Sequence, residues 1–480
     1  MTRSPTSSST PSSPPAAGDA FDRLALTPAQ LANLVTLGYH AMTPVQAAAL
    51  PAALAGADLI VQAQTGSGKT AAFALALLAR LKLNDQTQPF AVQALVLCPT
   101  RELADQVTTE IRRLARSDDN VKTLTLCGGV PLRNQLASLE HGAHVVVGTP
   151  GRVLDHLDRG ALTLTLLSTL VLDEADRMLD MGFFDDMARV AKLCPKDRQT
   201  LLFSATYPEG IAKLAQQFMR APTEVKVRAQ VDAAQIEQRF YEVKESERLH
   251  AGSLLLNHFR PASTLAFCNT KQQCRDVVEV LKAQGFAALA LHGELEQRER
   301  DQVLVQFANR SCSVLVATDV AARGLDIAQL EAVINVDTTP DAPLHIHRIG
   351  RTGRADATGL ALSLASLDEM GSVGKIELVQ GAEVTWHPLA ELTPAPGGRL
   401  LPPMVTLQIV GGRKEKIRPG DVLGALTGEA GFAASQIGKI NVNEFSTYVA
   451  VDRQIAEKAL KALAAGKVKG KKVKVRRIQD

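Results

Sequence analysis

A glycine-rich loop early in the chain has the residues needed to hold a triphosphate. Segment 63–70 reads AQTGSGKT and lies between the apolar run DLIVQ and the helix-forming stretch AAFALALLARL. Glycines let backbone N–H groups turn toward phosphate oxygens, and the start of the helix adds a partial positive charge. Ala63 stands where the usual pattern begins with glycine, which affects turn geometry more than chemistry. The residues expected to bind the nucleotide are Thr65, Gly66, Ser67, Gly68, Lys69 and Thr70.

Two adjacent carboxylates further along the chain would complete a hydrolytic site. LVLDEAD, at 170–176, places Asp173 and Glu174 at the end of an apolar run. A buried carboxylate is costly unless it meets a cation, and metal-bound phosphates supply one. We expect Lys69 to reach the β- and γ-phosphates and Thr70 to ligate Mg²⁺. Asp173 would hold the same ion through water, and Glu174 would orient and deprotonate the attacking water. A solvated surface pair is the alternative for the two carboxylates alone.

The elements that must position these groups are short, nearly continuous apolar runs. Such runs are typical of strands buried on both faces of a parallel sheet. They lie at 92–98, 144–148, 169–173 and 199–204, and again at 264–269, 287–293, 313–319, 332–337 and 360–366. The repeat predicts two α/β domains. Because ligands gather at the carboxyl ends of strands in open parallel sheets, those ends should form the working surface.

Composition shifts predict where the domains begin and end. Proline and glycine gather at 387–403, while 223–235 has the character of a linker. The pattern after Met404 predicts the order β-α-β-β-α-β, which is typical of RNA-recognition folds. The predicted organisation is a disordered Ser/Pro-rich tail (1–19), a first domain (20–222), a linker (223–235), a second domain (236–386), a Pro/Gly linker (387–403) and a small α+β domain (404–480).

Charge is concentrated at the carboxyl end of the chain. The whole protein has 53 Lys and Arg against 50 Asp and Glu, but residues 404–480 hold 15 basic and 7 acidic residues. This density favours contact with a phosphate backbone, a solvated cationic face being the alternative. The six cysteines form no C-x-x-C pair, so neither a zinc site nor a disulfide framework is indicated and a reducing cytoplasm is expected. No membrane span or secretory signal is predicted.

The ordered motifs resemble those of the DEAD-box RNA helicases over residues 20–385. They are PTRELA at 99–104, GG at 128–129, TPGR at 149–152, DEAD at 173–176, SAT at 204–206, HGELEQRER at 292–300, VATDVAARGLDI at 316–327 and HRIGRTGR at 347–354. The resemblance implies two RecA-like domains and RNA-stimulated hydrolysis of ATP to ADP and phosphate, with ATP and Mg²⁺ as the cofactors. A DNA-translocating helicase and an RNA clamp that does not unwind are the alternatives.

Roles for individual residues follow from the same resemblance. GYHAMTPVQ, at 38–46, resembles the adenine-reading motif through Gln46, and Tyr39 and Phe21 either line the adenine pocket or belong to the core. Arg351 and Arg354 would stabilise charge on the transferring phosphoryl group, with Asp326 near the ribose. The residues implied to face RNA are Pro99, Thr100, Arg101, Gly129, Thr149, Pro150, Gly151, Arg152, Arg300 and Thr318. Ser204, Thr206 and His347 would couple ATP to RNA, a strand-end turn being the alternative for SAT. Arg348 is either functional or structural.

Because Lys69 and Arg351 fall in different predicted domains, the resemblance implies an active site completed by domain closure. The last domain resembles the RNA-binding domain of the DbpA subfamily. This implies a hairpin of large-subunit ribosomal RNA and pre-ribosomal particles as partners of a monomeric, cytoplasmic protein, a generic RNA remodeller being the alternative. The strand VTLQIVGG has no aromatic residue, so base stacking on the sheet is doubtful. Arg413, Lys414, Lys416, Lys439 and the terminal basic cluster are better candidates for RNA contact.

Overall fold

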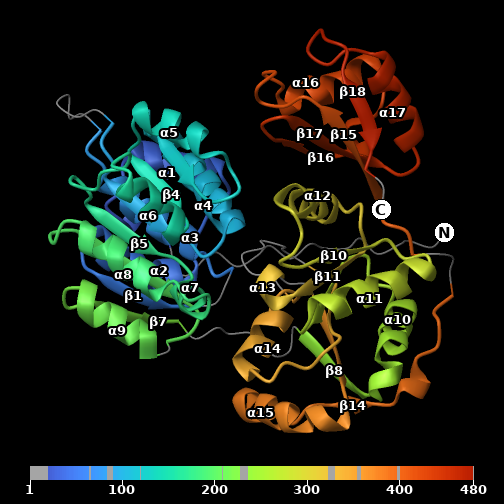
Figure 1. Cartoon of the computed structure of the whole chain (residues 1–480). Helices are drawn as coiled ribbons and strands as arrows, with labels where there is room; N and C mark the ends of the chain where they lie inside the picture. The colour runs from blue at the N-terminus through green and yellow to red at the C-terminus, as the bar shows by residue number, and fades with distance from the viewer. Residues whose placement is uncertain are drawn as a thin grey trace, which may run out of the picture. The chain divides into compact units, whose positions relative to one another are not determined.

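The computed structural model divides into two compact units (Figure 1). It describes residues 20–63, 66–83, 90–118, 120–207, 209–227, 236–322, 330–353, 358–396 and 400–478. The tail expected at 1–19 and the linker residues 228–235 and 397–399 lie outside the described residues, as do Thr65, Asp326 and Arg354. No helix among the described residues combines the length and the apolar composition needed to cross a membrane.

The first unit is built on a seven-stranded parallel sheet in the order β3-β4-β2-β5-β6-β1-β7. The strands are β1 (Leu59–Gln62), β2 (Ala94–Leu97), β3 (Thr123–Leu126), β4 (Val145–Gly148), β5 (Thr169–Leu172), β6 (Gln199–Ser204) and β7 (Thr223–Lys226). The helices are α1 (Pro28–Thr36), α2 (Pro44–Leu54), α3 (Lys69–Ala79), α4 (Arg101–Leu114), α5 (Leu132–Glu140), α6 (Pro150–Asp158), α7 (Ala175–Asp180), α8 (Phe184–Leu193) and α9 (Glu209–Phe218).

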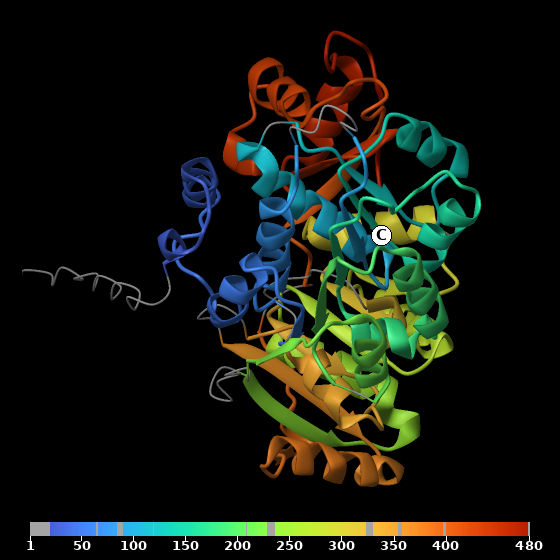
Figure 2. The same ribbon diagram turned by 90° about the vertical axis from the view of Figure 1, so that its left-hand side faces the viewer.

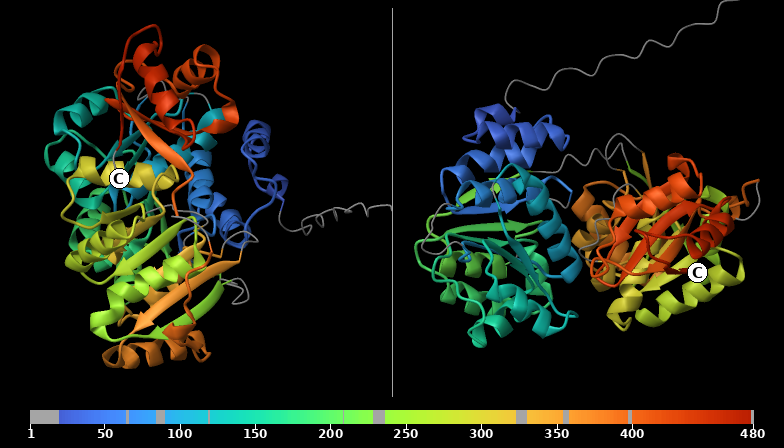
Figure 3. Two further views of the ribbon diagram at one scale, coloured as in Figure 1. Left: turned by 90° about the vertical axis from the view of Figure 1, so that its right-hand side faces the viewer. Right: turned by 90° about the horizontal axis from the view of Figure 1, so that it is seen from above.

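Helices cover both faces of this sheet, as the view from above in Figure 3 shows. Successive strand side chains point to opposite faces, so each strand contributes to two cores. In β2, Val96 packs into the core with α2, α3 and α4, whereas Leu95 and Leu97 pack into the core with α6, α8 and α9. The apolar runs of the sequence are nearly continuous for this reason.

The second unit contains another seven-stranded parallel sheet, in the order β10-β11-β9-β12-β13-β8-β14. Its strands are β8 (Ile236–Glu242), β9 (Thr264–Cys268), β10 (Ala288–Leu291), β11 (Val314–Thr318), β12 (Ala332–Asn335), β13 (Gly359–Ala365) and β14 (Trp386–His387). Its helices are α10 (Arg248–Phe259), α11 (Lys271–Ala283), α12 (Gln297–Ala308), α13 (Asp319–Ala322), α14 (Ala342–Ile349) and α15 (Met370–Gln380). The two sheets share one strand order when counted along the chain, which confirms the predicted pair of α/β domains.

Two edge strands include residues that were expected to belong to linkers. Residues 223–226, expected to begin a linker, form β7, which pairs with β1 and extends the first sheet. His387, expected to begin the second linker, pairs with Tyr241 in β14. Edge strands are short and partly exposed, so they lack the long apolar run that makes a central strand visible in a sequence.

The same unit ends in a four-stranded antiparallel sheet, seen in red in Figures 1 and 2. Its order is β16-β17-β15-β18, from β15 (Met404–Val410), β16 (Ile437–Val442), β17 (Ser446–Asp452) and β18 (Lys474–Arg477). The helices α16 (Pro419–Gly424), extended by one π turn over Ala425–Glu429, and α17 (Ala456–Ala465) complete the predicted β-α-β-β-α-β order. We call residues 404–478 the C-terminal module.

Candidate nucleotide and RNA sites

Strand order in the first sheet separates the predicted site residues into two groups. All the strands are parallel, so their carboxyl ends share one edge of the sheet. The neighbours β5, β6 and β1 lead into the DEAD, SAT and glycine-loop segments. The neighbours β3, β4 and β2 lead into GG, TPGR and PTRELA. The predicted nucleotide residues and the predicted RNA residues therefore lie side by side along this edge.

The glycine loop adopts a backbone conformation that favours glycine. Gly66 has φ +83° and Gly68, which precedes the first residue of α3, has φ +91°. A Cβ atom on Gly68 would lie 2.6 Å from Nε2 of Gln46 and 2.9 Å from Oγ1 of Thr43. Positive φ and close packing both exclude a side chain at this position.

The side chains of Thr43 and Gln46 form hydrogen bonds with backbone carbonyl groups of the glycine loop. Thr43 Oγ1 donates to the carbonyl oxygen of Ser67 at 2.7 Å, and Gln46 Nε2 donates to that of Gly68 at 3.1 Å. Gln46 Oε1 accepts from the Thr43 backbone N–H at 2.9 Å, which forms a capping box at the start of α2. Gln46 is 1% exposed, so in this structure its amide supports the loop. Sequence reasoning gave Thr43 no role, although it lies inside GYHAMTPVQ.

Tyr39 and Phe21 contact one another beside the same core. Their ring centroids are 6.3 Å apart in an edge-on arrangement, and Phe21 is buried. The Tyr39 hydroxyl donates to Oε1 of Glu110, on α4, at 2.5 Å. Burial and then the Glu110 carboxylate raise the pKa of Tyr39 well above its usual value. These contacts favour the core interpretation of both rings.

The charged groups of the nucleotide site are buried together. Lys69 is 6% exposed and its Nζ donates to the carbonyl oxygen of Ala63 at 2.8 Å. Burial raises the pKa of Asp173 to about 7, and the nearby Lys69 ammonium opposes that shift. Glu174 has φ +51°, and its Oε2 lies 3.4 Å from Nε of Arg177. That oxygen is buried and has no hydrogen-bond donor among the described residues. A cradle closed to Cβ atoms and two buried carboxylates fit a metal-bound triphosphate.

Asp176 connects the DEAD and SAT segments. Its Oδ2 accepts from the backbone N–H groups of Ala205 and Thr206 at 3.1 and 2.8 Å and from the Thr206 hydroxyl at 2.9 Å. Ser204 Oγ donates to the Thr206 carbonyl oxygen at 2.5 Å. Burial alone would raise the pKa of Asp176, but the bonds from Thr206 hold it below its usual value. Sequence reasoning quoted Asp176 inside its motif without assigning it a role.

The predicted RNA residues of the first unit lie at helix starts along the shared edge. Thr100 caps α4 by accepting from the Leu103 N–H at 3.3 Å, and Pro99 and Arg101 flank it. Thr149 precedes α6, whose first three residues are Pro150, Gly151 and Arg152. Gly129 has φ +75°. The partial positive charge at a helix start suits contact with a phosphate group.

Gln135, on α5, forms hydrogen bonds with both the segment that contains GG and the segment TPGR. It donates to the Cys127 carbonyl oxygen at 2.8 Å, and its Oε1 receives Nη1 of Arg152 at 3.0 Å. The same oxygen lies 2.8 Å from Nε2 of the fully buried His156. Burial, then Arg152, lowers the pKa of His156. No sequence signal pointed to Gln135, because its role depends on contacts among three distant segments.

Arg348 joins three strand ends in the second unit. It is 1% exposed, and Nε and Nη2 donate to the two carboxylate oxygens of Asp319 at 2.8 and 2.7 Å. Further bonds reach the Asp337 carbonyl oxygen at 2.7 Å and Oδ1 of Asn269 at 3.0 Å. These partners follow β11, β12 and β9. Complete burial with every bond internal favours the structural interpretation of Arg348.

The other predicted residues of this unit lie around that cluster. Thr318 ends β11 immediately before Asp319, and Nη2 of Arg300 donates to the Ala321 carbonyl oxygen at 2.8 Å. His347 lies on α14 next to Arg348. Arg351 is 6% exposed, and its backbone N–H donates to the Arg348 carbonyl oxygen at 3.2 Å. The structure therefore brings Arg300 and Thr318 together at α13, and it places Arg351 one turn beyond the buried arginine.

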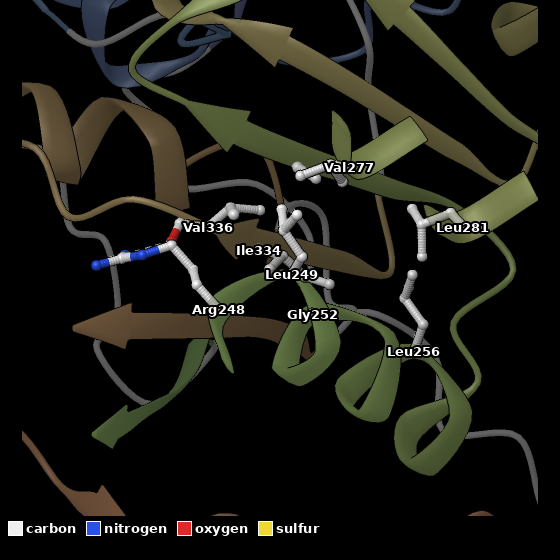
Figure 4. Close-up of a pocket in the computed structure, with 9 residues that line it drawn as sticks. Arg248, Leu249, Gly252, Leu256, Val277, Leu281, Ile334 and Val336 are labelled. Carbon is white, nitrogen blue, oxygen red and sulfur yellow. Dashed lines mark hydrogen bonds between the residues drawn. The ribbon is translucent and has the colours of Figure 1, made fainter. Parts of the chain in front are cut away.

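A small pocket in the second unit is lined by none of the predicted site residues (Figure 4). Leu249 and Leu256 of α10, Val277 of α11 and Ile334 of β12 line it. Its free volume of about 10 Å³ is at the lower limit for a single water molecule. We interpret it as a packing gap between helix and sheet.

Comparison with known proteins agrees with this geometry. The chain matches the DEAD/DEAH box helicase family over residues 43–214, the helicase conserved C-terminal domain over 248–356 and the DbpA RNA binding domain over 406–477. It is 52% identical to the ATP-dependent RNA helicase DbpA of Escherichia coli, over 94% of this chain and 97% of that protein. It is 41% identical to the DEAD-box ATP-dependent RNA helicase CshA of Geobacillus kaustophilus, over 74% and 76%.

A solved structure extends the comparison to three dimensions. Saccharomyces cerevisiae Dbp5 bound to RNA and ADP BeF3 matches with a TM-score of 0.70 at 32% identity, over 77% of this chain and 96% of that one. Since the matches span both sheets and the C-terminal module, the chain belongs to the DEAD-box ATP-dependent RNA helicases that carry a DbpA-type RNA-binding domain.

Proposed function

We propose that the C-terminal module directs this RNA helicase to a hairpin of large-subunit ribosomal RNA, and that the enzyme acts there during assembly of the large ribosomal subunit. The observation that carries this proposal is the 52% identity to E. coli DbpA along almost the whole chain, together with the DbpA-type module at 406–477. The excess of basic residues in that module supports binding to a phosphate backbone. We further propose that the protein works as a cytoplasmic monomer on pre-ribosomal particles.

For the ATP site, we propose that Lys69 binds the β- and γ-phosphates while Thr70 and Asp173 hold Mg²⁺, partly through water. When bound, the ion would neutralise charge on the phosphates. Glu174 would accept a proton from the attacking water, and the burial of its carboxylate beside that of Asp173 supports this assignment. Arg351 and Arg354 of the second unit would stabilise charge on the transferring phosphoryl group.

Coupling of RNA to ATP is proposed to work by population shift. ATP and RNA would favour the same closed state of the helicase, which accepts a bent single strand and excludes a regular duplex. The Asp176–Thr206 contact supports such coupling, because it ties the DEAD segment to the SAT segment. Each ligand should then raise the affinity for the other by the same factor.

Phosphate release with RNA present tests the chemistry. Arg351→Ala and Glu174→Gln should each lower turnover by at least about 10²-fold, while ATP binding is retained by Glu174→Gln. Near-normal turnover in either variant would remove the proposed roles. RNA should stimulate the wild-type enzyme more than DNA of the same sequence does.

The targeting proposal needs a panel of RNAs at one stated salt concentration. ATPase stimulation by overlapping fragments of large-subunit ribosomal RNA should favour one hairpin in the full-length protein. A chain ending at Pro403 should lose that preference while it keeps stimulation by unrelated RNA. An unchanged preference after truncation would refute targeting by the module and would favour a generic remodeller.

A further inference from the structure

Internal contacts fill the sheet face of the C-terminal module. Thr406 and Gln408 of β15 and Tyr448 of β17 share the face opposite the helices, because Gln408 and Tyr448 are directly paired. They are 1, 4 and 3% exposed. Gln408 Nε2 donates to the Tyr448 hydroxyl at 3.2 Å. Thr406 Oγ1 lies 3.2 Å from Nδ2 of Asn309 and 2.7 Å from Oγ of Ser311, both in the loop after α12.

This arrangement leaves little room for an RNA base on the sheet. RNA-recognition modules commonly stack bases on aromatic side chains of their central strands. Tyr448 is the aromatic residue of β15 and β17, and it is already buried with its hydroxyl bonded. A base could stack there only if several buried hydrogen bonds were broken, at about 1 kcal/mol for each bond.

An exposed aromatic side chain lies instead at the tip of the β16–β17 turn. Phe445 is 58% exposed, and Nζ of Lys414 lies 4.6 Å from the centre of its ring. In the described residues 404–478 of the module, the two other aromatic rings are partly buried against the core (Phe432) or buried in the sheet (Tyr448). Phe445 is therefore the aromatic ring within reach of a ligand in this module.

Backbone hydrogen bonds hold that turn in place. The carbonyl oxygens of Asn443, Glu444 and Phe445 accept N–H groups from Arg413, Lys414 and Gly411 at 2.8, 3.1 and 3.0 Å. A Cβ atom on Gly412 would lie 2.2 Å from the Asn443 carbonyl oxygen, so only glycine allows this approach. The turn that carries the Phe445 ring is therefore hydrogen-bonded to the loop that contains Gly412. Because both segments are already ordered, a ligand that binds there loses no affinity to ordering them.

Exposed basic side chains belong to the loops and strand end next to this turn. Arg413, Lys414 and Lys416 belong to the loop that supports the turn, and all three are exposed. Lys469 Nζ donates to the carbonyl oxygen of Lys416, and Lys474 is paired with Val410 at the start of that loop. Two acidic residues lie among them: Glu415 accepts the Gly412 N–H at 2.7 Å, and Glu444 pairs with Lys414 at 3.3 Å. With Lys471 and Lys472 of the same segment as Lys469, seven basic residues outnumber the two acidic ones.

We infer that this loop end, comprising residues 411–417, 443–446 and 468–474, is the RNA-binding surface of the module, and that Phe445 stacks on an unpaired base. Aromatic stacking needs an exposed base face, so the preferred ligand is RNA that presents unpaired bases next to its backbone phosphates. Arg413, Lys416 and Lys469 would contact those phosphates. The inference deepens the proposed targeting function and rests on the module binding RNA.

Equilibrium binding of fluorescent RNA to full-length variants tests this inference. The probes are overlapping hairpin fragments of large-subunit ribosomal RNA, oligo(U) as an unrelated single strand and a blunt duplex. Phe445→Ala should weaken binding of RNA with unpaired bases about 5- to 150-fold, and Phe445→Trp should restore it. Blunt-duplex binding should be unchanged. Leu423→Ala, at an exposed apolar position on α16, is the matched control and should bind like wild type.

Salt dependence separates stacking from charge. Lys416→Ala should weaken the binding of all the RNAs. It should also reduce the slope of log association constant against log salt concentration by about 0.7 to 0.9. Phe445→Ala should leave that slope unchanged. Lys461→Ala, at an exposed position on α17, is the charge control.

Two further outcomes keep the inference separate from the targeting proposal. If no ribosomal fragment is preferred but Phe445→Ala still weakens RNA binding, targeting fails and the loop-end surface stands. If one fragment is preferred and Phe445→Ala binds it within twofold of wild type, the inference is overturned. Photocrosslinking of 4-thiouridine RNA to the wild-type protein gives an independent readout. A crosslink within residues 443–445 supports the inference, and crosslinks confined to β15 and to residues 447–452 of β17 contradict it.

Discussion

Replacement of Gly68 by alanine tests whether the side chains of Thr43 and Gln46 shape the glycine loop. The substitution has two costs: the backbone cost of a positive φ, and the cost of collisions with these two side chains. An L-residue at φ +91° costs about 1–2 kcal/mol. The new Cβ would also lie 2.6 Å from Nε2 of Gln46 and 2.9 Å from Oγ1 of Thr43. Relief of those contacts moves both side chains and breaks their bonds to the loop carbonyl groups, at about 0.5–1.5 kcal/mol each.

The chain contains a matched control for the first of these costs. Gly160 has φ +66°, and a Cβ atom there meets open space, so Gly160→Ala includes the backbone cost alone. The difference between the two variants is about 1–3 kcal/mol. If the free loop relaxes and must regain its shape to bind ATP, this difference corresponds to about 5- to 150-fold weaker ATP binding.

Titration with a fluorescent ATP analogue in the presence of Mg²⁺ measures this effect, and thermal unfolding of both variants gives the stability cost. Thr43→Ala in the Gly68→Ala background should recover part of the lost affinity, because it removes one colliding atom. Gly68→Ala that binds ATP within twofold of Gly160→Ala would refute the reasoning, since the packing of Thr43 and Gln46 would then not shape the loop.

Three further predictions concern buried polar contacts. Thr206→Val removes only the hydroxyl donor to Asp176 and should lower strand displacement per ATP hydrolysed by about 5- to 10-fold, with ATP binding unchanged. His345 is 1% exposed, neither ring nitrogen has a partner in the described chain, and burial lowers its pKa to about 4. As the pH is lowered, the unfolded state binds a proton at His345 before the folded state does. The free energy of unfolding should therefore fall by about 2 kcal/mol from pH 7 to pH 5, and His345→Leu should remove this fall when stability is measured by urea unfolding. Arg348→Gln should destabilise the second unit by about 3–5 kcal/mol, because the Asp319 carboxylate loses both its donors, and a change below 1 kcal/mol would contradict the role of this cluster.

Central strands were visible in the sequence because both of their faces are buried. The run at 199–204 matches β6 residue for residue. β3 (Thr123–Leu126) was missed because its middle residues are only partly buried, and its residues TLTL form no long apolar run. β7 was missed for the same reason at the opposite edge. Burial on two faces leaves a pattern in the sequence, whereas pairing at an edge depends on a strand far away in the chain.

The places of the nucleotide-site motifs on helix and strand could also be predicted, but the contacts that support them could not. Spacing alone placed Lys69 at the start of a helix and Asp173 after a strand, because each motif is local. The contact of Gln46 with Gly68 joins residues 22 positions apart, and that of Asp176 with Thr206 joins residues 30 positions apart. No local pattern encodes such a distance, since it depends on how the strands are ordered in the sheet.

The amino-acid sequence by itself determined the two α/β domains, the phosphate-binding loop and the basic character of the last module, because these depend on periodicity, spacing and composition. Only the tertiary structure decided that Gln46 supports the loop, that Arg348 is buried among three strand ends and that the sheet face of the module is filled while Phe445 is exposed. The physical reason is that burial and hydrogen-bond partners are properties of the packed chain, in which distant segments meet.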